Sequence, residues 1–180
     1  GGIGGLTAAH ALLRKNISME LYERASHFSP TVGAAVAISI NGQIALASLG
    51  LTDSMSRILH PMSKWVILGE KNQLIANSEV LRELQKRHGF SLSGVLRADL
   101  VRMLAQPLTQ AGMMHYNSEV VAVKQTGRTA RVRLSNGTEC EADLVIGADG
   151  INSTVAKVAL GQASDEPIYS GENVFYGVIE

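Results

Sequence analysis

The spacing of apolar residues along the chain predicts a mixture of helices and strands. Apolar residues recur at helical spacing within 5–15, a stretch that is also rich in alanine, and a short apolar strand is expected at 17–22. A second helical pattern runs over 97–110. The residues that share its apolar face are Leu100, Val101, Leu104 and Leu108. These two periods together are typical of an α/β protein.

The segments between these helices have weaker patterns. The small apolar stretch 34–40 is strand-like, and 42–49 has a helical pattern that Gly50 is placed to end. The segment 79–88 is charged and poorly periodic, so we expect a loop there with at most one helical turn.

Alternating segments separated by turn residues predict hairpins. Strands are expected at 65–68 and 73–76, joined by a four-residue turn that contains Gly69 and Asn72. A longer meander follows, in which Ser135-Asn136-Gly137 supplies a hairpin turn. The strands of this meander are expected at 119–125, 130–134 and 138–142.

Composition excludes several classes of protein. The 180 residues suit one domain or slightly more, and 46% of them are hydrophobic, enough for a core. The formal net charge is zero, so nothing indicates a nucleic-acid partner. A single cysteine, Cys140, excludes an internal disulfide, and the five histidines lack metal-ligand spacing. No apolar run is long enough for a membrane span, and we expect a cytoplasmic protein, with targeting left open by an absent N-terminal segment.

The most specific signal is the glycine-rich start, which matches most of a G-x-G-x-x-G turn. Gly2 would be its second glycine, where a missing Cβ lets the backbone approach a pyrophosphate, and Gly5 the third, which lets the helix pack closely. Glu23 ends the next predicted strand, where an acidic side chain can accept hydrogen bonds from ribose hydroxyls. The pattern predicts dinucleotide binding. Because its first glycine and leading strand are absent, we expect the chain to be a fragment of a longer protein.

A second motif closes the apolar run 144–146, which we expect to be a parallel strand buried on both faces. The segment 143–153, with Asp149-Gly150 at its centre, resembles the "DG" motif of FAD-dependent aromatic-ring monooxygenases, the family of para-hydroxybenzoate and salicylate hydroxylases. Three further stretches are similar to motifs of this family in the same order: 2–6 with Glu23, 33–41, and the R-x-x-L-x-x-x-L helix that starts at Arg97. Two positions depart from the pattern, since Ile40 stands where proline is usual and Ala156 where arginine is usual.

The resemblance implies a fold, a cofactor and a set of contacts. The fold would be α/β, with a Rossmann-like FAD/NAD(P)-binding domain that has a parallel sheet and a β-meander, plus part of a substrate-domain sheet. Its divisions would be 1–60 and 94–166 for FAD binding, 61–93 for a substrate-domain insertion, and 167–180 for the start of the substrate domain. The cofactor-binding residues would be Gly2, Gly5, Glu23, Arg24, Asn41, Arg97, Asp149 and Gly150. No residue stands out as catalytic, and no metal is expected.

For the intact parent, the resemblance implies a monooxygenase in which NAD(P)H reduces FAD and O2 supplies one oxygen atom to an aromatic or related small molecule. This chain alone would be inactive. Two alternatives remain open from the sequence: an NAD(P)-dependent dehydrogenase, and a non-catalytic truncated FAD-binding fragment. Three of the named polar residues could instead have a purely structural role. Glu23 could be a solvated residue at a strand end, Arg97 a solvated residue at a helix start, and Asp149 a turn-forming residue.

Overall fold

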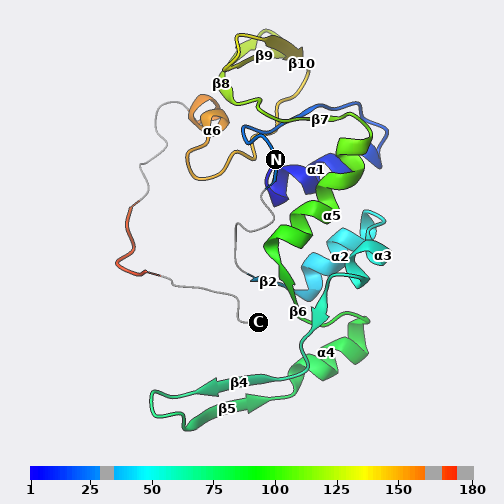
Figure 1. Cartoon of the computed structure of the whole chain (residues 1–180), viewed down its shortest axis with the longest axis vertical. Coiled ribbons are helices and arrows are strands. Elements are labelled where there is room, and N and C mark those ends of the chain that lie inside the picture. The colour runs from blue at the N-terminus through cyan, green and yellow to red at the C-terminus, as the bar shows by residue number, and fades with distance from the viewer. Residues whose placement is uncertain (29–34, 161–167, 174–180) are drawn as a thin grey trace. The chain divides into compact units, whose positions relative to one another are not determined.

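A computed structural model describes residues 1–28, 35–160 and 168–173 of the chain (Figure 1). They form two compact units. Unit 1 comprises Gly1–Ser29 and Val101–Tyr176, and unit 2 comprises Pro30–Leu100 and Gly177–Glu180. Helix α5 (Arg97–Gln110) begins in unit 2 and continues in unit 1. The expected α/β class is confirmed, because parallel and antiparallel strand pairs occur beside the helices.

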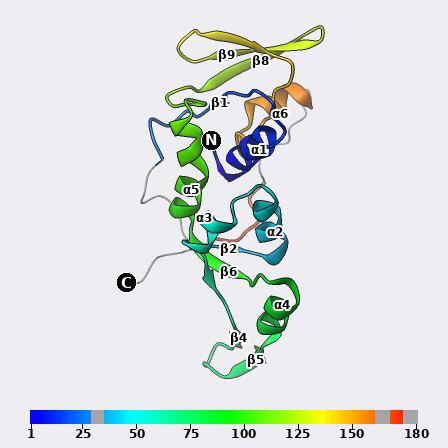
Figure 2. The same ribbon diagram turned by 90° about the vertical axis from the view of Figure 1, so that its right-hand side faces the viewer.

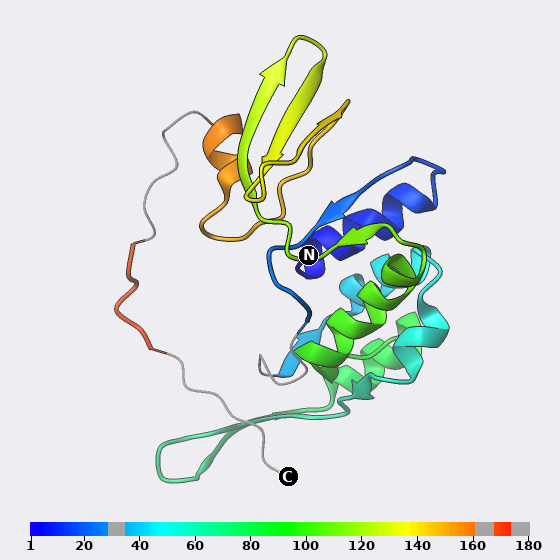
Figure 3. The same ribbon diagram turned by 45° about the horizontal axis from the view of Figure 1, so that its top comes forward.

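The core of unit 1 forms between α1 (Ile3–Leu13) and the part of α5 that belongs to this unit, which lie side by side (Figures 1 and 3). Leu6, Leu104 and Leu108 are completely buried, as their helical spacing predicts. His10 is buried too, and its Nε2 donates a hydrogen bond of 2.9 Å to the Leu104 carbonyl. This hydrogen bond links α1 to α5, so His10 has a structural role.

Two sheets complete unit 1. Strand β1 (Leu21–Tyr22) pairs in parallel with β7 (Met114–His115). The predicted meander is confirmed, with strand order β10-β9-β8 and antiparallel pairing throughout. Strands β8 and β9 lie side by side in Figure 2. Its strands are β8 (Val120–Thr126), β9 (Thr129–Leu134) and β10 (Glu139–Ala142). Gly137 has φ 86°, the conformation that the predicted hairpin turn needs. Helix α6 (Thr154–Ala159) packs beside β8.

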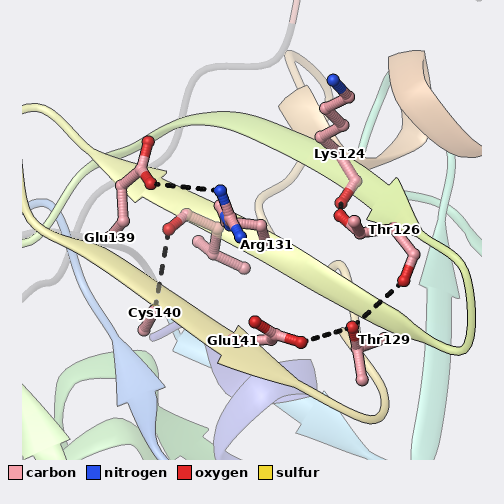
Figure 4. A network of polar contacts seen from close by, with 8 residues as sticks. Lys124, Thr126, Thr129, Arg131, Glu139, Cys140 and Glu141 are labelled. Atoms are coloured by element: carbon pink, nitrogen blue, oxygen red, sulfur yellow. Dashed lines mark hydrogen bonds and ion pairs between the residues drawn. The ribbon is translucent and has the colours of Figure 1, made fainter.

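The meander carries polar contacts between its strands, drawn in Figure 4. Thr129 Oγ1 donates to Glu141 Oε1 at 2.6 Å, and Arg131 Nη1 lies 3.8 Å from Glu139 Oε2. Both partners of the ion pair are half exposed, so the pair contributes little to stability. Cys140 is a free thiol on the partly buried side, consistent with the absence of an internal disulfide.

Unit 2 is built on an antiparallel sheet with the order β2-β6-β3. Its strands are β2 (Ala35–Ile38), β3 (His60–Pro61) and β6 (Ser93–Leu96), and helices α2 (Ile40–Ser48) and α3 (Thr52–Ser56) follow β2. Gly50 follows the C-cap of α2 with φ 81°, so the predicted end of this helix is confirmed. The Gln43 amide is buried and donates to the Ile38 carbonyl at 3.0 Å and the Ser93 hydroxyl at 3.2 Å, which joins α2 to β6.

The hairpin predicted in unit 2 is also confirmed. Strands β4 (Trp65–Leu68) and β5 (Leu74–Ser78) pair antiparallel and form a long two-stranded ribbon (Figure 1). Its apolar side chains remain exposed: Trp65, Val66, Ile67, Leu68, Leu74 and Ile75. So many large apolar side chains exposed on one hairpin are unusual for a surface element.

Three expectations about secondary structure need correction. The segment expected to be a loop, 79–88, forms helix α4 (Val80–His88), which Gly89 ends at φ 74°. The strand expected at 17–22 is only Leu21–Tyr22. The run 144–146 is not a strand, and Leu144 is 70% exposed, because no strand of the described residues pairs with it. In the part of the chain that the structure describes, no helix has the length and apolar character needed to span a membrane.

Candidate cofactor-binding site

The glycine-rich start forms the N-terminus of α1. Gly2 is the N-cap residue, and no side chain caps the helix or places an acid in its first turn. The first backbone N–H groups of α1 therefore have no side-chain acceptor, and together with the helix dipole they favour an anionic ligand. A Cβ built on Gly2 would meet no atom within 4 Å, so open space lies in front of this residue.

Glu23 lies directly beside this turn. Its Oε2 is 3.0 Å from the Gly1 nitrogen, and its Oε1 accepts a 2.9 Å hydrogen bond from the Ala25 N–H. A Cβ on Gly1 would lie 2.3 Å from the same Oε2, so only glycine at position 1 leaves the carboxylate in place. The structure thus brings together the glycine turn and the acid that the sequence predicts as partners.

The environment of Glu23 favours its charged form. Burial by itself would raise the pKa of this carboxyl, but hydrogen bonding, first from the Ala25 N–H, outweighs burial and holds the pKa below its ordinary value. Glu23 is therefore a carboxylate at neutral pH, an acceptor of hydrogen bonds only. The two hydroxyl groups of a ribose can donate hydrogen bonds to such a carboxylate.

Gly5 faces the second motif. A Cβ on Gly5 would lie 3.4 Å from the Ala148 Cβ, so the first turn of α1 packs against the residue that precedes Asp149. The two glycine-containing motifs of unit 1 are neighbours in space although about 140 residues separate them. No periodicity in the sequence could reveal this contact.

The Asp149 carboxylate binds backbone N–H groups at the start of α6. Its carboxylate accepts hydrogen bonds from the Thr154 N–H at 2.7 Å and the Val155 N–H at 3.2 Å, and it also contacts the Ser153 hydroxyl. Burial would raise its pKa, yet these donors, the Ser153 hydroxyl first among them, lower it. Gly150 follows with φ 80°. All of these bonds orient α6, so the structure gives Asp149 a capping role and leaves any direct contact with a cofactor as a prediction.

The backbone of Gly147 lies very close to Val155 of α6, and this close approach leads to a first prediction. A Cβ on Gly147 would lie 2.7 Å from the Cβ of Val155, a stiff branched side chain that cannot rotate away. We expect Gly147→Ala to displace α6 and lower the free energy of unfolding by about 1–3 kcal/mol. Urea denaturation followed by circular dichroism measures this loss.

The matched control is Gly4→Ala, the same substitution within α1. A Cβ there would meet no atom within 4 Å, and alanine favours the helix, so stability should be unchanged or rise by up to about 1 kcal/mol. Equal effects of the two substitutions would show that the contact of Gly147 with α6 does not matter.

Three further residues are predicted to bind the cofactor: Arg24, Asn41 and Arg97. Arg24 is exposed next to Glu23. Arg97 and Asn41 belong to unit 2, where the β2–β6 register pairs Ala35 with Leu96 and Ile38 with Ser93. Arg97 therefore follows the ladder at the end where β2 begins, and Asn41 follows the opposite end. The Asn41 side chain contacts the Ser39 hydroxyl at the start of α2. The structure does not bring Asn41 and Arg97 together, and Gly33 and Ala34 lie outside the described residues.

The residues of unit 1 fit the ADP half of FAD. The uncapped helix start with open space at Gly2 suits a pyrophosphate, and the ionised Glu23 beside it suits the adenosine ribose. Within the residues that the structure describes, no cluster of histidine, cysteine and acidic side chains could hold a metal ion.

Comparison with known proteins agrees with this fit. A family profile described as an FAD binding domain matches residues 1–174. An FAD-dependent monooxygenase of Talaromyces verruculosus is 32% identical over 99% of this chain, and so is the 3-amino-4-hydroxybenzoate 2-monooxygenase PtmB3 of Streptomyces platensis. The chain covers 38% and 44% of those two proteins. It therefore spans about two fifths of the relatives' length.

Solved structures give the same picture. The Klebsiella pneumoniae HpxO complexed with FAD and uric acid superimposes with a TM-score of 0.78 at 26% identity, covering 87% of this chain and 39% of that one. A 2-methyl-3-hydroxypyridine-5-carboxylic acid oxygenase superimposes with a TM-score of 0.74 at 28% identity, covering 89% of this chain and 40% of that one. The Rossmann-like FAD domain expected from the sequence is thereby confirmed, and the chain belongs to the FAD binding domain family.

Proposed function

We propose that this chain is the FAD-binding portion of a monooxygenase that uses NAD(P)H and O2 to hydroxylate an aromatic or related small molecule. The observation that carries the proposal is the pairing of an uncapped, glycine-lined helix start with the ionised Glu23. The relatives named above as monooxygenases support the reaction class. Because the chain belongs to an FAD-binding family, the monooxygenase is favoured over the NAD(P)-dependent dehydrogenase.

The residues of the chain would contribute binding and orientation. Backbone N–H groups at the start of α1 would hold the pyrophosphate, and Gly2 would let it approach closely. Glu23 would accept hydrogen bonds from the ribose hydroxyls, and Asp149 would keep α6 in place through its capping bonds. The flavin supplies the redox chemistry when it is bound.

The domain division is part of the proposal. We assign 1–60 and 94–166 to FAD binding, 61–93 to a substrate-domain insertion and 167–180 to the start of the substrate domain. The exposed apolar side chains of β4 and β5 support a role for the hairpin in a larger sheet. Catalysis and substrate choice would then depend on the whole protein, and this chain alone would bind FAD without turnover.

Arg97 provides a second prediction. It is the first residue of α5 and is half-buried, and a cation there opposes the helix dipole, so a bound anionic group would compensate it. We expect Arg97→Ala to weaken FAD binding by about 1.5–3 kcal/mol, the scale of a hydrogen bond to a charged group. Fluorescence titration of the flavin-free whole protein measures this change.

The control for Arg97 is Arg87→Ala, which removes an exposed arginine from the last turn of α4. FAD affinity should not change in that variant. An equal loss in both variants would indicate general electrostatic attraction, and no loss at Arg97 would exclude its contact with FAD.

The monooxygenase reaction itself is tested with the whole protein and a panel of phenols, aminobenzoates and hydroxypyridines. We expect one or more of these compounds to accelerate NADH or NADPH oxidation and to gain one atom from isotopically labelled O2. Retention of FAD without any labelled product across the panel, together with efficient hydride transfer to another acceptor, would contradict the proposal.

A further inference from the structure

His115 supports the strand that presents Glu23. The parallel pair β1–β7 consists of Leu21 opposite Met114 and Tyr22 opposite His115. One residue further, the Glu23 N–H donates a 2.8 Å hydrogen bond to the His115 carbonyl. The pair is so short that the conformation of Glu23 depends strongly on this backbone pairing.

The His115 side chain strengthens the same connection. Its ring stacks on the Tyr22 ring with 5.2 Å between centroids and 24° between planes, and its Nε2 contacts the Glu20 carboxylate. Through backbone and side chain, one residue of β7 therefore contacts Glu20, Tyr22 and Glu23.

Among the residues that the structure describes, two titratable side chains contact this ring. Glu20 faces its Nε2, and Tyr22 covers its face. Burial, first, and then contact with Cys140 and the charge of Glu20 raise the pKa of Tyr22 to about 12, so the phenol is neutral in the physiological range. The remaining support of Glu23 comes from the backbone, where the Ser118 N–H donates to the Glu23 carbonyl at 2.8 Å.

We propose that His115 is a positioning residue for FAD. Its contacts with Glu20 and Tyr22 hold residues 20–23 in place and so orient the Glu23 carboxylate toward the adenosine ribose. The inference rests on the proposed function, because it requires that Glu23 binds FAD. His115 itself would touch no part of the cofactor. Its effect would therefore pass entirely through Glu23.

A double-mutant cycle tests this dependence. FAD dissociation constants are measured by fluorescence titration of the flavin-free whole protein for wild type, His115→Ala, Glu23→Ala and the double variant. We expect His115→Ala to weaken FAD binding about three- to tenfold, and to add less than about twofold in the Glu23→Ala background. His88→Ala, an exposed histidine at the end of α4, is the control and should change nothing.

A second variant, Glu20→Ala, guards against poor folding of His115→Ala. Glu20 is exposed, so its loss should leave the fold intact while it releases the His115 ring. It should weaken FAD binding about twofold or more, again only when Glu23 is present. Urea midpoints of all variants separate this effect from a loss of stability.

The outcomes distinguish the inference from the function on which it rests. Equal weakening by His115→Ala with and without Glu23, or no weakening in either His115→Ala or Glu20→Ala, would overturn the positioning role while FAD binding stands. An unchanged FAD affinity in Glu23→Ala would overturn the assignment of Glu23 and the inference with it. A wild-type protein that does not bind FAD would refute the proposed function itself.

Discussion

Replacing Glu23 by alanine should weaken FAD binding to the whole protein by about 1.5–3 kcal/mol, the usual contribution of a hydrogen bond to a charged group. The carboxylate is mostly buried beside the glycine turn, and its pKa lies below the ordinary value of 4.5. It therefore stays ionised through the neutral range and becomes protonated only in acid. The difference between wild type and variant should be constant from about pH 6 to 8.

The matched control for Glu23 is Glu70→Ala, which removes an exposed carboxylate from the turn between β4 and β5. Fluorescence titration of both variants should show a loss of affinity only at Glu23. Unchanged affinity in Glu23→Ala would contradict the ribose contact, and a loss in both would indicate that net charge rather than position governs binding.

The largest effect on stability is expected from Leu104→Ala, which should lower the free energy of unfolding by about 2–5 kcal/mol. The Leu104 side chain is completely buried between α5 and α1, where His10 also bonds its carbonyl. Alanine would leave a cavity that the two linked helices cannot close. Urea denaturation of this chain measures the loss.

The control is Leu144→Ala, because Leu144 is 70% exposed in the same unit. This substitution should change the stability of the chain by no more than about 0.5 kcal/mol. If Leu104→Ala were as mild as Leu144→Ala, the core between α1 and α5 would be loosely packed, in conflict with the structure.

The elements that the sequence predicts correctly are those whose pattern is local. Helix α5 has a continuous apolar face, and the meander alternates and turns at Asn136-Gly137. Helix α4 is missed because its apolar residues are few. It is favoured instead by good helix formers, by Gly89 after its end and by basic residues in its last turn.

The run 144–146 is misjudged for a different reason. Its apolar character is real, but a strand exists only with a hydrogen-bonded neighbour, and no described strand pairs with it. Local composition specifies what a segment can become. The pairing that decides the outcome depends on residues distant in the sequence.

The same distinction applies to the candidate site. Glu23 and the glycine turn are predictable because a strand, a helix and a turn of fixed length connect them. The neighbours that pairing brings in, Ala148 against Gly5 and His115 against Tyr22, have no signal in the sequence. The capping role of Asp149 is likewise visible only when α6 is seen to start at its carboxylate.

The most direct test of the account is the visible absorption spectrum of the purified chain after FAD has been added and the free cofactor removed by desalting. We predict that flavin bands remain, and that they are much reduced in the Glu23→Ala variant. A colourless chain that circular dichroism shows to be folded would contradict the claim that the glycine turn and Glu23 hold FAD.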